Sequence, residues 1–380
     1  MTVVVTGGTG FTGTYLLRSM LSRDVGDVAV LSRDEPGKAH ARLLSALEAL
    51  GAPSAVLDAA RRRVSTVQAD IGHPGLNLPD DRFQALADSM TELWHCAADT
   101  TLQADPARLR RANLDGTRNV LALAETAAPG TRVRHLSTAF VAGRRREGLI
   151  LEGDLDGSAG FENAYEQSKY HAEVAVRDWS CRTGRSVLVL RPSLMIPDGP
   201  VPAGAPSHQL ASLVSLLARM RAVHRRPGAA PMTVRLPGHP DARLNMVQVG
   251  YAAEAMLDAS TRMAAPPAEG TVTTLHLVHP QDTSAEHLWR LAAEHVPEFR
   301  FTLGPPPADP NFFERFAAKY FQPFLPFAWH RRSYDRSRLL SLLPGGREPG
   351  PPNLDFLFAE FLPTRFERRP VATAERLSPR

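Results

Sequence analysis

The sequence predicts an α/β fold in which a doubly wound parallel sheet carries helices on both faces. Three observations lead to this prediction. An apolar stretch at residues 3–5 runs through a glycine-rich turn into a helix-patterned segment. Strand-like and helix-like segments then alternate as far as residue 192. Of the 380 residues, 43% are hydrophobic, enough for a large buried core. The strand, glycine turn and helix at the start make the sheet Rossmann-type.

The N-terminal turn has the glycine spacing of a dinucleotide-binding loop. Gly7, Gly10 and Gly13 form GxxGxxG between the predicted strand and the helix that follows it. Glycine allows the tight turn and lets the backbone approach a pyrophosphate, to which the helix N-terminus offers free N–H groups. We therefore predict that these glycines, with Thr9 and Phe11 of the same loop, bind a dinucleotide.

The second predicted strand, residues 27–31, indicates which dinucleotide is bound. In NAD sites an acid near this strand end bonds the ribose 2′-OH, and Asp34 has about the right position. However, Ser32 and Arg33 follow the strand directly. A hydroxyl and a guanidinium suit a 2′-phosphate, which an acid would repel. The sequence therefore predicts NADPH as the cofactor.

Four further strands are predicted, and their ends define the ligand site. They cover residues 64–70, 93–98, 133–138 and 187–192. In parallel sheets of this kind, ligands bind at the carboxyl ends of the strands. The residues that fall there are Ala97, Ala98, Thr138 and Pro192.

The segment NAYEQSK, residues 163–169, carries the predicted chemistry. Tyr165 and Lys169 lie four residues apart and share a helix face. A tyrosine hydroxyl, with a pKa near 10, is a poor acid–base catalyst at neutral pH unless an ammonium stabilises its anion. Lys169 is one of only three lysines in the chain, so a chance match to YxxxK is improbable. We predict that Tyr165, Lys169 and the strand-borne Thr138 form a catalytic trio.

TGGTGFTG, HLSTAFVAG and YEQSK, in this order, resemble the extended short-chain dehydrogenase/reductase family over roughly residues 2–290. The resemblance implies that Thr138 is the catalytic Ser/Thr and Tyr165 the acid–base. It implies that Lys169 holds the nicotinamide ribose and lowers the pKa of the tyrosine. It also assigns cofactor roles to the three glycines, to the adenine-side pair Asp70 and Ile71, and to Asn113 of the central helix.

A narrower similarity is to the thioester reductases: terminal reductase domains of nonribosomal peptide synthetases, carboxylic acid reductases and fatty acyl-CoA reductases. It rests on residues 30–47, 135–173 and 244–257; Gly250 departs from the pattern, where an acid is common. The similarity implies reduction by NADPH of a thioester held on coenzyme A or on an acyl or peptidyl carrier protein. The product would be an aldehyde, or an alcohol after a second reduction. Because the sequence begins at the first strand, we expect an enzyme that acts in trans.

The rest of the chain is expected to bind the substrate. We predict an NADP-binding domain at 1–194, a substrate-binding segment at 195–242 and a return to the first domain at 243–279. A second substrate-binding segment, 280–366, precedes a mobile tail at 367–380, and this smaller domain should be mostly helical. An amphipathic helix is expected at 211–226.

Aromatic and basic residues are candidate substrate contacts. Residues 312–329 hold eight aromatics, expected either in the core of the smaller domain or lining an acyl site. Two clusters of basic residues could bind a phosphopantetheine or an acidic carrier domain. For each cluster, the alternative is that it forms solvated surface. These basic candidates are Arg144, Arg145 and Arg146, which follow the predicted catalytic strand, and the cluster of Arg219, Arg221, Arg225 and Arg226. Ser137, beside Thr138, is a separate candidate substrate contact.

Composition favours some classes of protein over others. The net charge of +4 comes with no nucleic-acid-binding signature, no apolar run approaching about 18 residues and no metal-like cysteine or histidine spacing. We therefore expect a cytoplasmic enzyme without nucleic acid, metal or integral membrane segment. Three alternatives remain: a steroid-type alcohol–ketone oxidoreductase, a sugar-nucleotide epimerase, and a non-enzymatic dinucleotide sensor.

Overall fold

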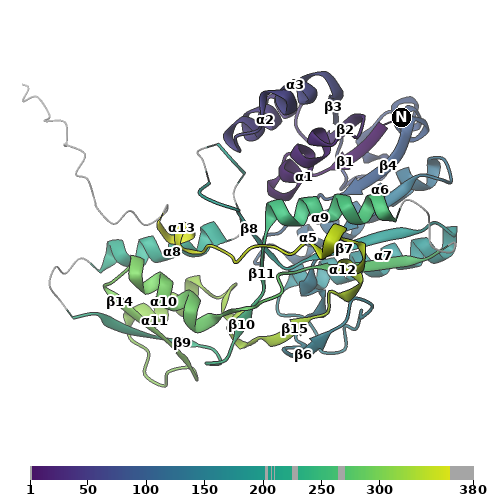
Figure 1. Ribbon diagram of the computed structural model, residues 1–380. Helices are drawn as coiled ribbons and strands as arrows, with labels where there is room; N and C mark the ends of the chain where they lie inside the picture. Colours follow the sequence, from purple (N-terminus) through teal and green to yellow (C-terminus); the bar gives the residue numbers. More distant parts are fainter. Residues whose placement is uncertain are drawn as a thin grey trace, which may run out of the picture.

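The computed structural model describes residues 2–201, 204–206, 208, 210–224, 230–263 and 270–359. Its centre is a sheet of seven strands, all parallel, in the order β3-β2-β1-β4-β5-β7-β12 (Figure 1). The strands are β1 (Thr2–Thr6), β2 (Asp27–Ser32), β3 (Val64–Gln68), β4 (Met90–His95), β5 (Arg132–Leu136), β7 (Val187–Pro192) and β12 (Val272–Leu277). The order reverses between β1 and β4, where a doubly wound sheet binds its ligand. The predicted fold class is confirmed.

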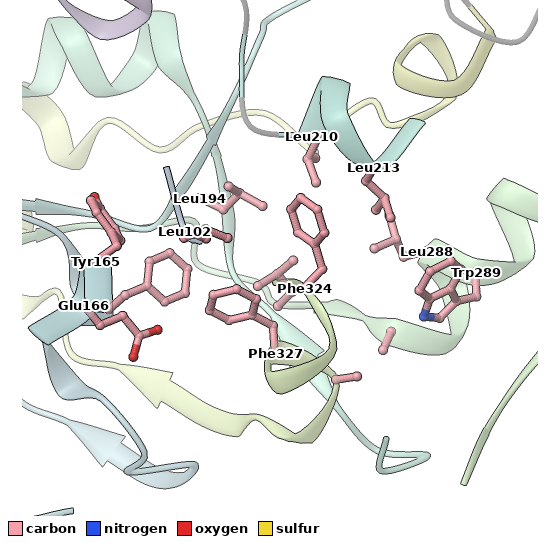
Figure 2. A pocket seen from close by; sticks show the side chains of 14 residues that line it. Leu102, Tyr165, Glu166, Leu194, Leu210, Leu213, Leu288, Trp289, Phe324 and Phe327 are labelled. Atoms are coloured by element: carbon pink, nitrogen blue, oxygen red, sulfur yellow. The ribbon is translucent and has the colours of Figure 1, made fainter. Parts of the chain in front are cut away.

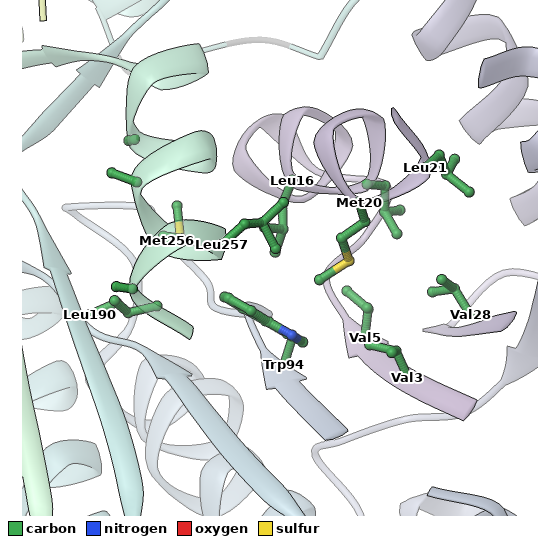
Figure 3. Packing of buried hydrophobic residues seen from close by; sticks show 14 of the residues in the cluster. Val3, Val5, Leu16, Met20, Leu21, Val28, Trp94, Leu190, Met256 and Leu257 are labelled. Carbon is green, nitrogen blue, oxygen red and sulfur yellow. The ribbon is translucent and has the colours of Figure 1, made fainter. Parts of the chain in front are cut away.

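Two hydrophobic cores, one on each face, hold helices against this sheet. Alternate residues of β1 supply them: Val3 and Val5 enter one core, and Val4 enters the other. The first core packs α1 (Phe11–Ser22), α2 (Pro36–Ala49), α3 (Ser54–Arg63) and α9 (Val249–Arg262). The second packs α4 (Asp80–Ser89), α6 (Gly116–Thr126) and α7 (Ala164–Thr183). Figure 3 shows the first core, in which Trp94 of β4 lies beneath α1 and α9.

A third core lies outside the sheet and belongs to the smaller part of the molecule. It packs α8 (Leu210–Val223), α10 (Ala285–His295), α11 (Phe312–Tyr320) and α13 (Asp355–Ala359). The same core includes a parallel strand pair, β9 (Met232–Pro237) and β14 (Phe299–Gly304). Helices α8 and α10 come from the two predicted substrate-binding segments, so one core joins these segments (Figure 1).

Short strand pairs connect the smaller part to the sheet. They are β8 (Leu194–Ile196) with β11 (Met246–Gln248), β10 (Arg243–Leu244) with β13 (Thr283–Ser284), and β6 (Glu147–Ile150) with β15 (Arg331–Tyr334). After β15, helix α12 (Ser337–Leu342) places Leu339 in the first core. The Glu152 carboxylate accepts the Arg338 and Leu339 backbone N–H groups at the start of α12. Thus part of segment 280–366 packs on the sheet.

The departure at Gly250 has a structural explanation. The backbone N–H of Gly250 in the first turn of α9 donates to the Asp198 carboxylate at 2.9 Å. A Cβ atom at position 250 would lie 2.7 Å from that carboxylate oxygen. Glycine at position 250 therefore leaves room for the Asp198 carboxylate.

Within the described residues, no helix combines the length and the hydrophobicity that crossing a bilayer requires. The predicted tail, 367–380, lies outside the described residues, as do Arg225 and Arg226.

Candidate active site

The glycine turn forms a cradle that side chains would fill. Gly7 has φ +72°, and a Cβ atom there would lie 2.7 Å from the backbone nitrogen of Ala97. A Cβ at Gly13 would lie 2.1 Å from the Gly7 carbonyl oxygen. Helix α1 begins after Gly10 without a side-chain cap, so its first N–H groups point into the turn. These features fit a dinucleotide pyrophosphate.

The end of β4 lies against this turn. The Thr6 hydroxyl accepts the N–H groups of Cys96 and Ala97, each at 3.1 Å, and lies 2.8 Å from His95. Ala97 and Ala98 follow as small residues that leave the space over the turn open. Both residues follow the carboxyl end of β4, and Ala97 lies beside Gly7 of the turn.

The end of β2 presents two arginines instead of one. Arg33 is exposed there, and the Ser32 hydroxyl, which is buried, accepts the Asp34 N–H. Arg42 of α2 reaches back to the same place: it forms an ion pair with Asp34 at 2.5 Å and donates to the hydroxyl of Thr9. The sequence alone does not indicate a role for Arg42, because only the fold of α2 brings this residue, nine positions after Arg33, to the end of β2.

The adenine-side pair lies at the end of β3. The Asp70 carboxylate accepts the Gly72 N–H and contacts the His73 ring at 3.0 Å. Ile71 packs beside Gly116 of α6, where a Cβ atom would lie 3.0 Å from its Cδ1. The Asn119 side chain fixes the Ile71 carbonyl at 2.7 Å.

The predicted catalytic trio comes together at the carboxyl edge of the sheet. Thr138 follows β5, and Tyr165 and Lys169 lie on the first turns of α7, capped by the Asn163 side chain. All three members of the trio are buried. The Thr138 hydroxyl lies in hydrogen-bonding range of the Tyr165 phenol; burial raises the pKa of Tyr165, and this contact lowers it by a smaller amount.

The Lys169 side chain is buried. Its ammonium donates to the Leu136 carbonyl at 2.8 Å, and burial lowers its pKa to about 8, while Glu173 opposes the shift. Burial, with Lys169 as a further cause, lowers the pKa of His95 to about 3 and that of His135 well below its usual value. Both imidazoles are therefore neutral at pH 7, and Lys169 carries the charge of this site.

Asn113 links the trio to the loop after β4. Its amide donates to the Ser168 hydroxyl at 2.8 Å and to the Asp99 carbonyl at 3.0 Å, and it accepts the Asp99 N–H. It lies in a π-helical segment, Arg110–Asp115, which adds a residue to the turn and directs the amide inward. The sequence pattern could place Asn113 on the central helix but could not reveal the π-helical turn.

The predicted substrate contacts do not lie in the pocket beside Tyr165. Ser137 is buried, its hydroxyl donates to Glu173 at 2.8 Å, and it is not among the residues that line this pocket. Arg145 is paired with Asp154 at 2.6 Å, and Arg144 lies 3.7 Å from Glu162. Neither arginine is among the residues that line the pocket.

An apolar pocket opens from Tyr165 toward the smaller part of the molecule. Figure 2 shows Tyr165 and Glu166 at one end and Trp289 at the other. Between them lie side chains from β8, α8, α10 and the turn Leu325–Trp329, with Phe324 just before it. The lining residues include Leu102, Phe140, Leu194, Leu210, Leu213, Leu288, Phe324 and Phe327. Such a lining suits an acyl or aryl group.

The aromatic segment 312–329 divides between the two predicted roles. Phe313 and Phe321 are buried in the third core. Phe324 and Phe327 line the pocket, and Phe327 packs edge-on against Phe140 at 5.1 Å. Phe312 is 56% exposed on α11. Helical spacing alone could not separate these roles, because the helix ends at Tyr320 and the remaining aromatics lie on turns.

A family profile described as "Male sterility protein" matches residues 5–256. Isonitrile lipopeptide synthase of Streptomyces coeruleorubidus is 34% identical over 175 residues, covering 45% of this chain and 12% of that protein. Fatty acyl-CoA reductase wat of Drosophila melanogaster is 27% identical over 171 residues, covering 44% of this chain and 33% of that protein. The match thus spans a minor part of these relatives' length.

Solved structures resemble the whole chain. The terminal R domain of the myxalamid PKS-NRPS pathway has a TM-score of 0.72 and 25% identity, covering 95% of this chain and 89% of that one. The reductase domain of a nonribosomal peptide synthetase from Mycobacterium tuberculosis has a TM-score of 0.69 at 19% identity, covering 96% and 92%. UDP-glucose 4-epimerase from Bifidobacterium longum has a TM-score of 0.65 at 18% identity, covering 95% and 97%. The last two likenesses concern the fold alone.

Proposed function

The chain belongs to the Male sterility protein family, and from this premise we propose that it is an NADPH-dependent reductase of acyl thioesters. The membership confirms the family resemblance of the sequence. One observation carries the proposal furthest: the sheet edge that holds the buried trio of Thr138, Tyr165 and Lys169 also holds the glycine turn, and an apolar pocket opens beside Tyr165. An acyl chain in the pocket would bring its thioester carbonyl to Tyr165. The relatives include a protein named as a fatty acyl-CoA reductase.

The cradle residues would hold the dinucleotide, which supplies a hydride when bound. Gly7, Gly10 and Gly13 leave room for its pyrophosphate, and the start of α1 offers N–H groups to it. Lys169 and Asn113 order the nicotinamide side of the site. We propose Arg42, Arg33 and Ser32 as the group that binds a 2′-phosphate and so favours NADPH over NADH.

The catalytic residues would act on the thioester oxygen. The Thr138 and Tyr165 hydroxyls donate hydrogen bonds to the oxygen as it gains negative charge, which is the largest stabilisation such a site can give. Because burial raises its pKa, Tyr165 stays protonated and delivers its proton to this oxygen, while the Lys169 ammonium stabilises the resulting phenolate. The hemithioacetal formed on the substrate then expels a thiol, with a pKa near 8.5, and leaves an aldehyde.

The proposed substrate is a thioester on coenzyme A or on the phosphopantetheine of a carrier protein. The thiol is common to both carriers. The pocket determines the acyl part, and its apolar lining favours a hydrocarbon-rich group.

Cofactor oxidation and thiol release, measured together, test this function. The protein is mixed with NADPH and a panel of acyl-coenzyme A and carrier-bound thioesters, and absorbance at 340 nm and free thiol are followed. We expect one thiol released for the first NADPH oxidised, and a slower reaction with NADH. A Tyr165→Phe variant, folded and able to bind NADPH, should lose activity by about 10²- to 10⁴-fold. Oxidation with ketones but not with thioesters would favour the steroid-type alternative instead.

A further inference from the structure

One polar group in the apolar pocket has no role in the proposed reaction. Glu166 follows Tyr165 on α7 and is fully buried. It is the one charged residue among the described residues that line the pocket. Figure 2 shows its carboxylate at the same end of the pocket as Tyr165. A buried carboxylate in apolar surroundings is costly unless it is hydrogen-bonded.

One oxygen of the Glu166 carboxylate already accepts a hydrogen bond at the start of α7. Its Oε2 accepts the Glu162 backbone N–H at 2.9 Å, while the Glu166 N–H donates to the Asn163 side chain at 2.9 Å. This reciprocal cap fixes the start of α7. The other oxygen, Oε1, is buried and has no hydrogen-bond partner among the described residues. The cap therefore accounts for one oxygen of the carboxylate and not for the other.

The charge around Glu166 indicates which kind of ligand group fits. The Arg332 guanidinium is buried nearby and donates to the Gly143 and Arg145 carbonyls at 2.7 and 3.0 Å. It lowers the pKa of Glu166, although burial, the larger effect, raises that pKa to about 7. No ion pair between them is formed within the described part of the chain. A positive charge nearby disfavours a ligand ammonium, so a neutral donor is the better match.

We propose that Glu166 determines substrate specificity by accepting a hydrogen bond from a hydroxyl or amide N–H that the acyl group carries near its thioester end. The inference rests on the proposed function and names the substrate class for the same pocket. The donor must lie near the thioester because Glu166 and Tyr165 lie at the same end of the pocket, and Trp289 marks the other end. A substrate without the donor leaves Oε1 of Glu166 unpaired in a buried site. This cost lowers kcat/KM for that substrate relative to one that carries the donor.

The test compares acyl groups that differ in the donor. Wild-type protein is assayed at pH 8 with pantetheine thioesters of octanoate, 3-hydroxyoctanoate, N-hexanoylglycine and N-hexanoyl-N-methylglycine. The last lacks the amide N–H. We expect kcat/KM for the hydroxyl or amide substrate to exceed that of its donor-free partner by roughly 10- to 150-fold. The two pairs distinguish the hydroxyl from the amide as the source of the donor.

Glu166→Gln is the matched variant. Its carbonyl can still accept the Glu162 N–H and keep the cap of α7, while its NH₂ group replaces the free acceptor by a donor. We expect the substrate ratio to fall to near one, with a midpoint of thermal unfolding within a few degrees of wild type. A variant that lowers kcat/KM equally for all four substrates would show a merely structural role and overturn the proposal.

A binding measurement keeps the inference testable if the variant proves inactive. Calorimetric titration of 1,3-octanediol and 1-octanol into the protein with NADP⁺ should show tighter binding of the diol to wild type and equal binding to Glu166→Gln. Equal reduction of octanoyl and hydroxyoctanoyl thioesters by wild type would refute the inference and leave the proposed function standing. If no thioester is reduced and no thiol appears, the proposed function itself fails, and the inference with it.

Discussion

Burial shifts the pKa values of the two central side chains in opposite directions, and both shifts serve the proposed reaction. The phenol of Tyr165 is kept protonated, as an acid must be before it gives up its proton. The pKa of Lys169 falls to about 8, close to neutral pH, where the ammonium still predominates. YxxxK spacing predicts the pair, but not the depth of burial that sets these values.

The Lys169 shift predicts the pH dependence of the reaction. The ammonium is present below pH 8 and lost above it, so kcat/KM with saturating NADPH should stay level to about pH 8. Above that it should fall about tenfold per pH unit. In Lys169→Arg, whose guanidinium keeps its proton, any remaining activity should not show this decline. An unchanged decline in the variant would assign it to another group.

Arg42 provides a prediction about cofactor choice. Its removal takes away the guanidinium that meets Thr9 and Asp34 where a 2′-phosphate would bind. Arg42→Ala should raise KM for NADPH by about 10- to 100-fold and change KM for NADH little. The control is Arg61→Ala, which removes an exposed arginine paired with Glu48 and Asp58. An equal rise in KM for NADPH and NADH would contradict the assignment of Arg42 to the 2′-phosphate.

At the scale of elements, α7 carries the proposed catalytic pair, Tyr165 and Lys169, and is bound to the sheet through Glu173. Its Glu173 carboxylate pairs with Arg191 of β7 at 2.6 Å, with Arg177 at 3.0 Å and with Ser137 at 2.8 Å. The position of α7 was predictable from its cap and its Tyr–Lys pair. The hydrogen bond of Ser137 could not be predicted from the sequence, because its partner Glu173 lies 36 residues away.

Removing the Glu173 carboxylate should lower the free energy of unfolding. Glu173→Ala leaves Arg191 as an unpaired buried charge, which should lower the free energy of unfolding by about 3–5 kcal/mol at pH 7. Burial would raise the pKa of Glu173, but its partners hold it below the usual value. The stabilisation is therefore present above about pH 4.3 and lost as pH falls through the folded pKa.

Urea unfolding at pH 7 measures the free energy of unfolding of the wild type and of Glu173→Ala. Glu294→Ala is the control, because Glu294 pairs with Arg290 on the exposed face of α10. It should cost only about 0.3–0.5 kcal/mol. Similar losses in the two variants would contradict the role given to Glu173.

At the scale of the molecule, the pocket exists because two separately packed parts meet at the carboxyl edge of the sheet. Helix α7, packed on the sheet, supplies Tyr165, and the core joining α8 and α10 supplies the apolar walls. Alternation of strands and helices predicts the first part. The sequence predicts the smaller part only as apolar and largely helical. It does not predict the pocket walls, because they come from segments that lie far apart in the chain.

This arrangement predicts control of acyl size by α8. Leu213→Phe adds volume to the pocket wall and should reduce kcat/KM for long acyl chains by about tenfold or more, with a smaller effect on short ones. Leu216→Phe enlarges a partly buried residue of the same helix outside the pocket lining. It should leave the chain-length preference unchanged, as measured with acyl thioesters of four to twelve carbons. An identical preference in both variants would contradict the assignment of the pocket.

The most direct test of the account follows the hydride itself. The protein is incubated with NADPH deuterated at the transferring C4 position and an acyl thioester, and the product is trapped as an oxime and analysed by mass spectrometry. We predict an aldehyde with one deuterium at its carbonyl carbon, or an alcohol with two, together with free thiol and little product from Tyr165→Phe. Free thiol with an unlabelled carboxylic acid, or no deuterium in any product, would contradict thioester reduction at this site.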